Sequence, residues 1–324
     1  MTRFEVPDWD AAVASLRDAN ELTLACHVNP DGDALGALLA TALGLRQLGK
    51  TVHPTWAAAP AELPPSYAFL PGADLLVQPA DVPASGAFVA LDCGAAHRLG
   101  GLEARARAAE VSFNIDHHPG NDVFATFNIV VPTVSSSAEI VTRLLQDLGV
   151  EIDNDIATCL YVGILTDTGR FQYSNSTPDT LRLAADLLSL GVDAPLIAQE
   201  VYESAPFGFL KLVGRVLDRA VLFEEQRFVY SWFKLADLEE TGVAADETDG
   251  LIDMVRSTRA ADVAAMFKEQ REGGWRVSLR SKGPSVGELA RARGGGGHEL
   301  AAGFSATDVE ETARSLLADL ARAR

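Results

Sequence analysis

Residues 21–49 limit the possible folds of this chain more than any other stretch. ELTLAC (21–26) predicts a short buried strand, and ALGALLATALGLRQLG (34–49) predicts a long helix that ends at Gly49. The tight turn between them, within HVNPDGDA (27–34), holds one imidazole and two carboxylates, those of His27, Asp31 and Asp33. Ligands gather at the carboxyl ends of strands in α/β proteins, so these three side chains are candidate metal ligands.

The rest of the first half alternates between strand and helix patterns. Strands are predicted at 51–56, 86–94 and 111–118, and helices at 8–19, 97–110, 135–149 and 153–171. This alternation predicts a parallel sheet with helices on both faces. More residues of the ligand type lie at or near the ends of these elements: Asp92, Asp116, His117, His118 and Asp167.

The second half has a different pattern. Between about 178 and 217 only helices are expected, which suits a rigid connector. The patterns after it predict a hairpin of 219–225 with 227–233, strands at 261–270 and 275–282, and helices at 246–257, 285–293 and 308–323. We therefore expect a catalytic domain at 1–185, a helical linker at 186–217 and a smaller α+β domain at 218–324.

Charge and composition narrow the function. The net charge of -18 argues against binding of long nucleic acid through a general attraction to phosphates, so an anionic substrate must be held locally. Three scattered cysteines suit a reducing cytoplasm rather than a disulfide framework. The N-terminus lacks an apolar signal core and no run of 18 apolar residues occurs, so no membrane span is expected.

The ligand types indicate the kind of metal. Singly, an Asp after a strand is usually a turn former or a helix cap, but here several converge on one edge of the predicted sheet. Carboxylates mixed with imidazoles, without cysteine, suit Mn²⁺, Mg²⁺, Fe²⁺ or Co²⁺ better than a structural zinc. Two divalent ions would neutralise the four carboxylates of Asp31, Asp33, Asp92 and Asp167. Two ions roughly 3.5–4 Å apart suit a phosphoester hydrolase.

These motifs carry a family resemblance. HVNPDGDA, LDCG, DHH and TDTGRF resemble, in order, the four motifs of the DHH phosphoesterase family. GGGGHELAAGF, preceded by VSLRSKG, resembles the DHHA1 domain. The layout is similar to the group of bifunctional oligoribonucleases (nanoRNases) and pAp phosphatases. The resemblance implies hydrolysis of short oligonucleotides such as pApA to mononucleotides, and of 3'-phosphoadenosine 5'-phosphate (pAp) to AMP. Some relatives of this layout act on cyclic dinucleotides or their linear products.

The resemblance also implies roles for the motif residues. One ion would be bound by His27, Asp31 and Asp92, and the other by Asp33, Asp92, His117 and Asp167, with Asp92 bridging. Mn²⁺ is the favoured metal, with Mg²⁺ or Co²⁺ as alternatives. His118 would face the substrate phosphate as proton donor or ligand, and Asp116 would orient a histidine. Asn29 matches the motif and either contacts the site or stabilises the turn.

In the second domain, the glycine run predicts a substrate clamp. Gly295, Gly296 and Gly297 allow close approach of backbone N–H groups to a phosphate, with His298 adding a side-chain bond. A bare glycine run is otherwise typical of a flexible linker. Arg280 and Ser281 are further candidates for binding the substrate, as are Arg256 and Arg259, which are equally explained as solvated surface charges. A homodimer is implied by resemblance alone.

Other readings remain open. A single-strand DNA exonuclease of the RecJ type resembles this chain in both domains but carries an additional nucleic-acid-binding domain, for which no spare length is found. A family pyrophosphatase resembles the first domain only. A nucleotide-sensing module without turnover would share the fold, although all six metal-ligand positions are present here. Short nucleotides are the expected partners, since a cleft between two domains admits only short substrates.

Overall fold

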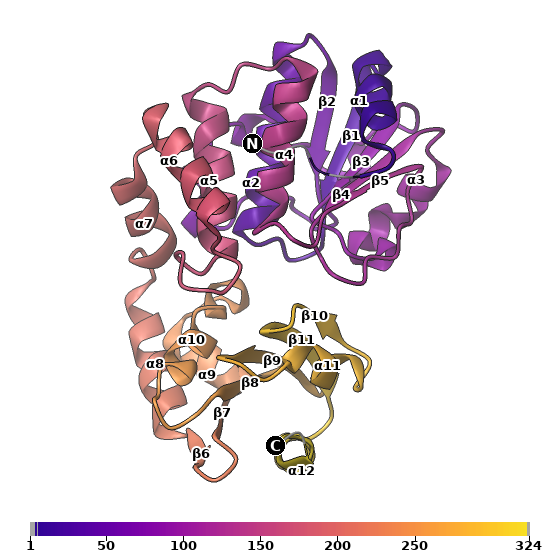
Figure 1. Ribbon diagram of the computed structural model, residues 1–324. Coiled ribbons are helices and arrows are strands. Elements are labelled where there is room, and N and C mark those ends of the chain that lie inside the picture. The colour runs from indigo at the N-terminus through magenta and orange to yellow at the C-terminus, as the bar shows by residue number, and fades with distance from the viewer. Residues whose placement is uncertain (1–3, 5, 323–324) are drawn as a thin grey trace. The chain divides into compact units, whose positions relative to one another are not determined.

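A computed structural model describes residue 4 and residues 6–322, apart from the side chain of residue 246. The chain divides into two compact units, Met1–Ser204 and Ala205–Arg324 (Figure 1). The expected domains include six residues that lie outside the described part of the chain: 1–3, 5, 323 and 324. The last residue of the predicted final helix, 323, is one of them. The segment predicted to be a helical connector contains α6 (Pro178–Ser189) and α7 (Ala194–Tyr202) in the first unit and α8 (Phe207–Asp218) in the second.

A five-stranded parallel sheet forms the centre of the first unit. Its strands are β1 (Glu21–Cys26), β2 (Thr51–Thr55), β3 (Ala87–Leu91), β4 (Ser112–Asp116) and β5 (Phe127–Val130). The order is β2-β1-β3-β4-β5, and every neighbouring pair is parallel. The predicted parallel sheet is therefore confirmed, while β5 was not predicted. This order places the carboxyl ends of β1, β3 and β4 side by side.

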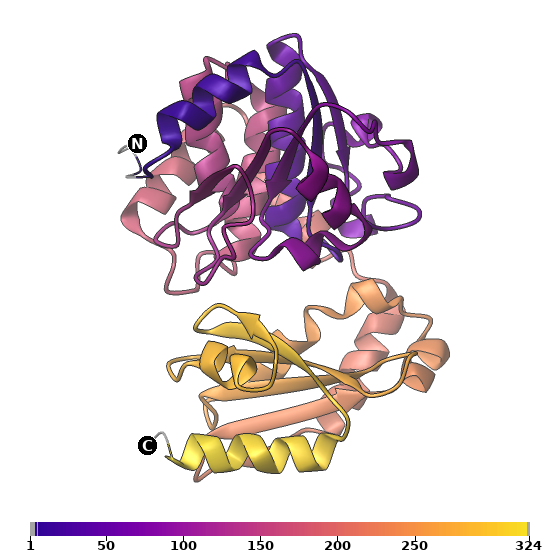
Figure 2. The same ribbon diagram turned by 90° about the vertical axis from the view of Figure 1, so that its right-hand side faces the viewer.

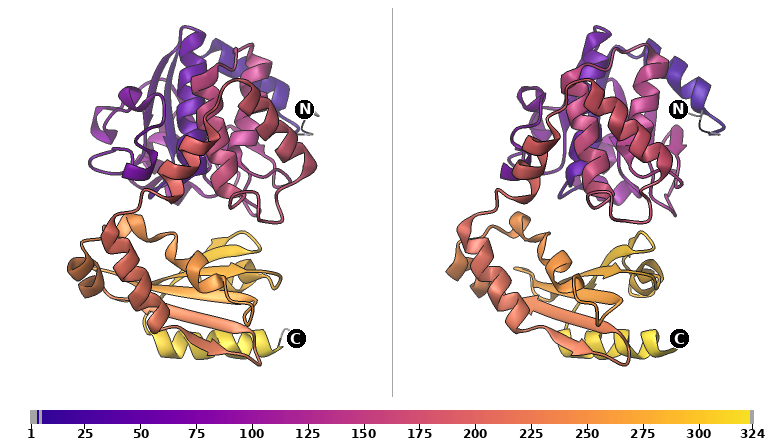
Figure 3. Two further views of the ribbon diagram at one scale, coloured as in Figure 1. Left: turned by 90° about the vertical axis from the view of Figure 1, so that its left-hand side faces the viewer. Right: turned by 60° about the vertical axis from the view of Figure 1, so that its left-hand side comes forward.

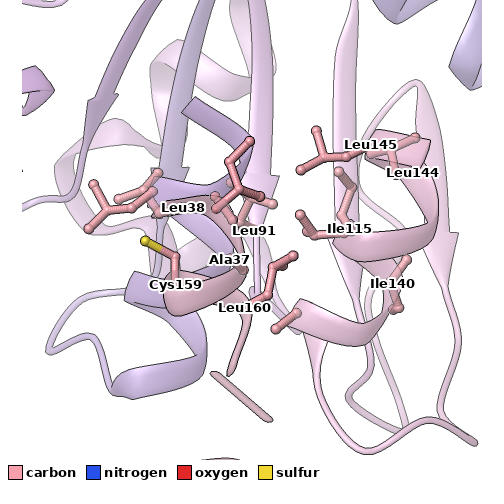
Figure 4. Close-up of a cluster of buried hydrophobic side chains, with 14 of the residues drawn as sticks. Ala37, Leu38, Leu91, Ile115, Ile140, Leu144, Leu145, Cys159 and Leu160 are labelled. Atoms are coloured by element: carbon pink, nitrogen blue, oxygen red, sulfur yellow. The ribbon is translucent and has the colours of Figure 1, made fainter. Parts of the chain in front are cut away.

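Helices cover both faces of this sheet, as predicted. One face packs on α1 (Trp9–Asp18), α2 (Gly32–Gln47), α4 (Ser137–Leu148) and α5 (Asn154–Asp167). The other packs on a 3₁₀ segment (Ala96–Leu102) and α3 (Glu103–Ala108), and three short 3₁₀ turns lie between β2 and β3 (Pro65–Tyr67, Ala73–Leu75 and Pro79–Asp81). Figure 4 shows the larger core, where Leu38 of α2, Leu91 of β3, Ile115 of β4, Ile140 of α4 and Leu160 of α5 are fully buried.

Two glycines allow α2 and α5 to pack unusually closely. A Cβ at Gly36 would lie 2.4 Å from the carbonyl oxygen of Cys159, and one at Gly163 would lie 2.8 Å from Oδ1 of Asp33. Any larger side chain would push the helices apart. Close packing thus brings the first turn of α2, which carries Asp33, near the helix that ends at Asp167.

The predicted helix at 153–171 is too long at its C-terminus. The helix ends at Asp167. After Thr168, three consecutive residues have positive φ values: 55° for Gly169, 62° for Arg170 and 60° for Phe171. Thr168 supports this turn, because its hydroxyl accepts the Phe171 N–H and donates to the carbonyl of Ile164. The chain reverses there instead of continuing as a right-handed helix.

The second unit is built on a mixed six-stranded sheet. Its strands are β6 (Val221–Phe223), β7 (Phe228–Phe233), β8 (Val263–Glu269), β9 (Trp275–Ser281), β10 (Gly296–Gly297) and β11 (Ala301–Ala306), in the order β10-β11-β9-β8-β7-β6. Only β7 and β8 are parallel neighbours. The β6–β7 hairpin and the two following strands confirm the prediction, whereas β10 and β11 were not predicted.

Helices cover this second sheet on both faces. One face packs on α8, α9 (Leu235–Thr241) and α10 (Leu251–Arg256), and the other on α11 (Val286–Arg291) and α12 (Val309–Arg322) (Figures 2 and 3). The prediction of one continuous helix at 246–257 is wrong. A 3₁₀ turn (Ala245–Thr248) is followed by α10, with Gly250 between them. The short helix α9 was not predicted.

Candidate metal centre

Three neighbouring strands bring the candidate ligands together at one edge of the first sheet. His27 directly follows β1, Asp92 directly follows β3, and Asp116 is the last residue of β4. Asp31 is the N-cap of α2, where its Oδ1 accepts the N–H of Ala34 at 3.0 Å. Asp33 lies in the first turn of the same helix. The predicted convergence at the carboxyl ends of the strands is therefore found.

One group of ligand-type side chains consists of His27, Asp31 and Asp92. Nε2 of His27 lies 3.5 Å from Oδ2 of Asp92 and 3.9 Å from Oδ2 of Asp31. Nδ1 of His27 lies 2.9 Å from the carbonyl oxygen of Val28, which can only accept, so Nδ1 carries a proton. This bond fixes the ring with Nε2 toward the carboxylates, as in histidines that ligate metals.

A second group consists of Asp33, Asp92, His117 and Asp167. Nε2 of His117 lies 3.3 Å from Oδ2 of Asp167, 3.7 Å from Oδ1 of Asp92 and 3.9 Å from Oδ2 of Asp33. Asp92 belongs to both groups, with Oδ2 toward His27 and Oδ1 toward His117. Ligands about 2.1 Å from one Mg²⁺-like ion in octahedral geometry lie about 3 Å apart, so these separations suit two neighbouring cations.

Burial makes these carboxylates costly without cations. The side chains of Asp33 and Asp92 are 1% and 2% exposed, and among the described residues no Lys or Arg forms an ion pair with either of them or with Asp167. Burial and the charges of Asp92 and Asp167 raise the pKa of Asp33 well above its ordinary value. Burial, with the charges of Asp31 and Asp92, raises the pKa of Asp167 to about 6. The cluster therefore fits divalent metal ions in composition and spacing.

The pKa of Asp92 is lowered, whereas that of its neighbour His118 is raised. Burial works to raise the pKa of Asp92, but the contact with His27 and the charges of His118 and His117 hold it well below its ordinary value. Burial works to lower the pKa of His118, yet the hydrogen bond with Asp116 and the charges of Asp92 and Asp116 raise it to about 10. The neighbouring imidazole rings thus favour the ionised form of Asp92.

His118 stands apart from the two ligand groups. Its Nδ1 lies 2.8 Å from Oδ1 of Asp116, which is fully buried, and 3.6 Å from Oδ1 of Asp92. The ring is 28% exposed, whereas that of His117 is 3% exposed. The histidine that Asp116 orients is therefore the exposed one, and its Nε2 is the ring nitrogen that Asp116 does not engage.

The N-terminus of α4 contributes contacts that the sequence did not reveal. The backbone N–H groups of Ser137 and Ala138 donate to the two carboxylate oxygens of Asp33 at 2.6 and 2.9 Å. The hydroxyl of Ser137 donates to Oδ1 of Asp92 at 2.8 Å. From the sequence alone, the serine run 135–137 at the start of this helix is explained by helix capping, and Ser136 is the N-cap. Because capping accounts for the whole serine run, nothing in the sequence indicates that Ser137 also contacts Asp92.

Asn29 lies in the turn between β1 and α2 with a φ of 53°. Asparagine adopts this left-handed conformation more readily than most residues, so Asn29 has a structural reason to be there. Asp92 also has a positive φ, 54°, at the end of β3. Both turns therefore need unusual backbone geometry to place the ligand-type side chains.

The candidate substrate-binding residues all lie in the second unit. Arg280 and Ser281 end β9, Arg256 ends α10, and Arg259 lies in the loop after it. Nε of Arg280 is buried without a hydrogen-bond partner, and the hydroxyl of buried Ser281 accepts the N–H of Gly283. The carbonyl of Arg259 accepts from Arg227.

The glycine run is ordered structure rather than a linker. Gly296 and Gly297 form β10, which pairs with Gly303 and Ala302 of β11, and His298 follows directly. A Cβ at Gly295 would lie 2.1 Å from the carbonyl oxygen of Gly303, and Gly297 has a φ of 130°. Close backbone approach thus accounts for both of these glycines, while a Cβ at Gly296 would meet open space.

Fold and site together define a two-unit α/β protein with a carboxylate–imidazole cluster at the carboxyl edge of a parallel sheet. The chain belongs to the DHH family: the profile of the DHH family, N-terminal domain, matches residues 21–164, and that of the DHHA1 domain matches residues 225–323. The resemblance recognised in the motifs is therefore confirmed. None of the helices in the described part of the chain is long and apolar enough to cross a membrane.

Relatives with assigned names carry a double activity in those names. The bifunctional oligoribonuclease and PAP phosphatase NrnA of Thermus thermophilus is 36% identical over 282 residues, which cover 86% of this chain and 82% of that protein. The protein of the same name from Bacillus subtilis is 30% identical, with 91% of each chain covered. Among solved structures, an exopolyphosphatase-related protein from Bacteroides fragilis has a TM-score of 0.88 at 24% identity, covering 99% of this chain and 98% of that one. Exonuclease RecJ bound to manganese has a TM-score of 0.55 at 16% identity, covering 99% and 96%, and these two structures show the fold alone.

Proposed function

We propose that this protein is a metal-dependent hydrolase that cleaves short oligonucleotides to mononucleotides and converts pAp to AMP. The names of its relatives support this activity. The observation that carries the proposal is the placement of Asp92, whose two oxygens face two separate groups of ligand-type side chains. Such an arrangement suits a pair of ions that act on one phosphate ester.

The ligand assignment is part of the proposal. His27, Asp31 and Asp92 would hold one divalent ion, and Asp33, Asp92, His117 and Asp167 the other. Such ions, when bound, polarise a phosphate ester and stabilise the charge that develops on its oxygens. Mn²⁺ is the metal we propose, because a mixture of carboxylates and imidazoles suits it.

Side chains of the first unit would contact the substrate and hold the metal ligands in place. Asp116 holds the Nδ1 proton of His118, so the ring would turn Nε2 toward the substrate. The contact with Asp116 favours the protonated form of His118, which suits a hydrogen bond to a phosphate oxygen or proton donation to the leaving group. Ser137 and the N-terminus of α4 hold Asp92 and Asp33 in place.

The second unit would bind the nucleotide. We propose that Gly295, Gly296, Gly297 and His298 form the phosphate-binding segment, with Arg280, Ser281, Arg256 and Arg259 as further contacts. Ordered pairing of β10 with β11 supports this, because a fixed backbone presents N–H groups at little entropic cost. The unpartnered, buried Nε of Arg280 is a donor suited to an anion.

Three further expectations belong to this proposal. The domain division at 1–185, 186–217 and 218–324 would separate catalysis, connection and substrate binding. A cytoplasmic location agrees with Cys26, Cys93 and Cys159, which are all free and buried. A homodimer is proposed from family resemblance alone.

Product analysis with Mn²⁺ tests the function. A labelled RNA dinucleotide, pAp and a long single strand of DNA are offered in parallel, with the Asp92→Ala variant as the blank. Rapid cleavage of the dinucleotide and pAp, with the long strand nearly untouched, is the expected result. Preferential degradation of the long strand would show a RecJ-like exonuclease instead, and no turnover of any substrate would show a nucleotide-binding module.

A further inference from the structure

Asn121, in the loop after β4, has all of its hydrogen-bonding capacity in use. Its Nδ2 donates to Oδ2 of Asp116 at 2.6 Å and to the carbonyl oxygen of Cys93 at 3.3 Å. Its Oδ1 accepts from Nδ2 of Asn114 at 3.0 Å and from the backbone N–H of Val123 at 2.7 Å. An amide side chain offers two donors and two acceptor positions, so every one of them is taken.

These partners settle which way the amide of Asn121 points. A backbone N–H can only donate, so the atom that faces Val123 must be the oxygen. The amide nitrogen therefore faces Asp116, and a flipped amide would set two oxygens against each other at that position.

Through this contact Asn121 controls the environment of His118. One oxygen of Asp116 is held by the ring of His118 and the other by Asn121. Asp116 is fully buried, so the loss of one partner would leave a carboxylate oxygen without the donor it needs. The carboxylate would then rotate toward another donor. The ring of His118 would lose its fixed orientation, because a side chain that is 28% exposed has few other contacts to hold it.

The residue that fixes the amide of Asn121, Val123, adopts a backbone conformation that valine disfavours. Val123 has a φ of 46° and is 61% exposed. A β-branched residue in the left-handed region is strained, and an exposed side chain offers little packing in return. The bond from the Val123 N–H to Oδ1 of Asn121 holds that conformation and fixes the amide.

We propose that Asn121 is a positioning residue for His118, acting through Asp116. The importance of this for turnover rests on the proposed function, in which His118 serves the reaction. A purely structural role would be loop closure, and Asn128 of β5, directly after this loop, does only this. Asn128 accepts the Ala125 N–H at 3.1 Å and donates to the Ala125 carbonyl at 2.8 Å, without touching the metal centre.

The test compares three variants. Asn121→Asp keeps the shape and the acceptor for Val123 but removes the donor to Asp116; Asn121→Ala removes both; Asn128→Ala removes only loop-closing bonds. The first readout is the imidazole N–H signal of His118 in NMR spectra of the metal-free protein, assigned with His118→Ala. We expect it in the wild type and in Asn128→Ala, and expect it shifted or broadened away in both Asn121 variants.

The second readout is steady-state kinetics with Mn²⁺ and an RNA dinucleotide. We expect both Asn121 variants to lower kcat by about 10- to 100-fold with KM within about threefold, and Asn128→Ala to stay within about twofold of wild type. Mn²⁺ affinity measured by calorimetry should be unchanged. In a His118→Ala background, Asn121→Ala should add almost nothing, because it acts through the missing ring.

Two results would overturn the proposal. One is a wild-type His118 signal in Asn121→Asp. The other is independent, multiplicative losses for Asn121→Ala and His118→Ala. If the wild type turns over no substrate, the proposed function fails, but the NMR comparison still decides whether Asn121 positions His118.

Discussion

Asp92 is the residue on which the metal centre depends most. It lies between the two ligand groups, accepts the Ser137 hydroxyl, and is almost completely buried. A buried carboxylate needs positive charge beside it. Either protonated histidines or bound metal ions can supply that charge to Asp92. Loss of this single carboxylate would therefore disturb both ligand groups at once.

Replacing Asp92 by Ala should lower kcat/KM for the dinucleotide and for pAp together, by more than the 10- to 100-fold typical of an outer-shell partner. The reason is that both proposed ion sites lose a ligand. Initial rates with Mn²⁺ measure this, with Asp186→Asn on the exposed face of α6 as the control. A variant with near-normal turnover of either substrate would contradict the two-ion assignment.

Asp167→Asn should stabilise the metal-free protein at pH 7. The folded pKa of Asp167 is raised to about 6, above its ordinary 3.8, so ionisation opposes folding above pH 6 and has no effect below about pH 4. The gain, up to about 3 kcal/mol, should therefore disappear as pH falls toward 4. Urea unfolding in the presence of a chelator measures it.

The same variant should lose most of the stabilisation that Mn²⁺ gives the wild type, since a ligand is gone. Asp186→Asn again serves as the control and should match the wild type with and without metal. A destabilised Asp167→Asn protein in chelator would show that like-charge repulsion is not the dominant cost at this position.

The convergence of the candidate metal ligands could be predicted because each follows a strand or opens or closes a helix. His27, Asp92 and Asp116 sit where buried apolar runs stop, and parallel strands bring those points together. Ser137 and Asn121 could not be predicted in the same way. Their roles depend on contacts with residues distant in sequence or folded back by a loop, and a serine before a helix is already explained as a cap.

At the scale of the element, short segments show where tertiary contacts override local preference. β11 is AAGFSA, a sequence rich in residues with little strand preference, and it forms because it pairs along its whole length with β9. The four residues of β5 similarly depend on β4. The end of α5 at Asp167 follows from a turn held by Thr168, which helical periodicity does not reveal.

The short helix α9 is attached to α8 through one buried carboxylate. Asp237 accepts hydrogen bonds from Arg215 of α8, from Arg219 directly after that helix, and from the backbone N–H of Lys234. The bond from Arg219, reinforced by those from Lys234 and Arg215, holds the pKa of Asp237 well below its ordinary 3.8. This carboxylate therefore stabilises the second unit whenever it is ionised in the folded state.

Asp237→Asn should lower the free energy of unfolding by about 1.5–3 kcal/mol, the usual value of hydrogen bonds to a charged group. Because the folded pKa is depressed, the loss should be complete above about pH 4 and should shrink as pH falls below that. Denaturant unfolding followed by tryptophan fluorescence measures it. Glu239→Gln, on the exposed side of the same helix, should be neutral, and equal effects of the two substitutions would contradict this role of Asp237.

For the whole molecule, the division into two units suggests a division of labour between chemistry and binding. The two groups of candidate metal ligands consist of residues before 205, and the glycine run lies after it. Changes in the second unit should therefore affect substrate affinity more than the chemical step.

His298→Ala should raise KM for the dinucleotide by about tenfold, which is the loss of one hydrogen bond to a charged group, with kcat nearly unchanged. His97→Ala, an exposed histidine in the first unit, should leave both constants as they are. Steady-state kinetics with Mn²⁺ separates the two effects. An unchanged KM in His298→Ala would remove the reason for placing that side chain in a substrate clamp.

The net charge of -18 leads to the last prediction, which concerns salt. Protein that binds nucleic acid through six or more phosphate contacts loses at least about 10³ in affinity between 50 and 200 mM salt, whereas one or two contacts to a single strand lose less than about tenfold. Because an acidic chain holds its substrate through a few local groups, KM for the dinucleotide should follow the weaker dependence. Measurements at fixed free Mn²⁺ across that range test this. A steep dependence would mean that a basic path for long nucleic acid exists despite the overall charge, and the exonuclease activity would then become the better description of the protein.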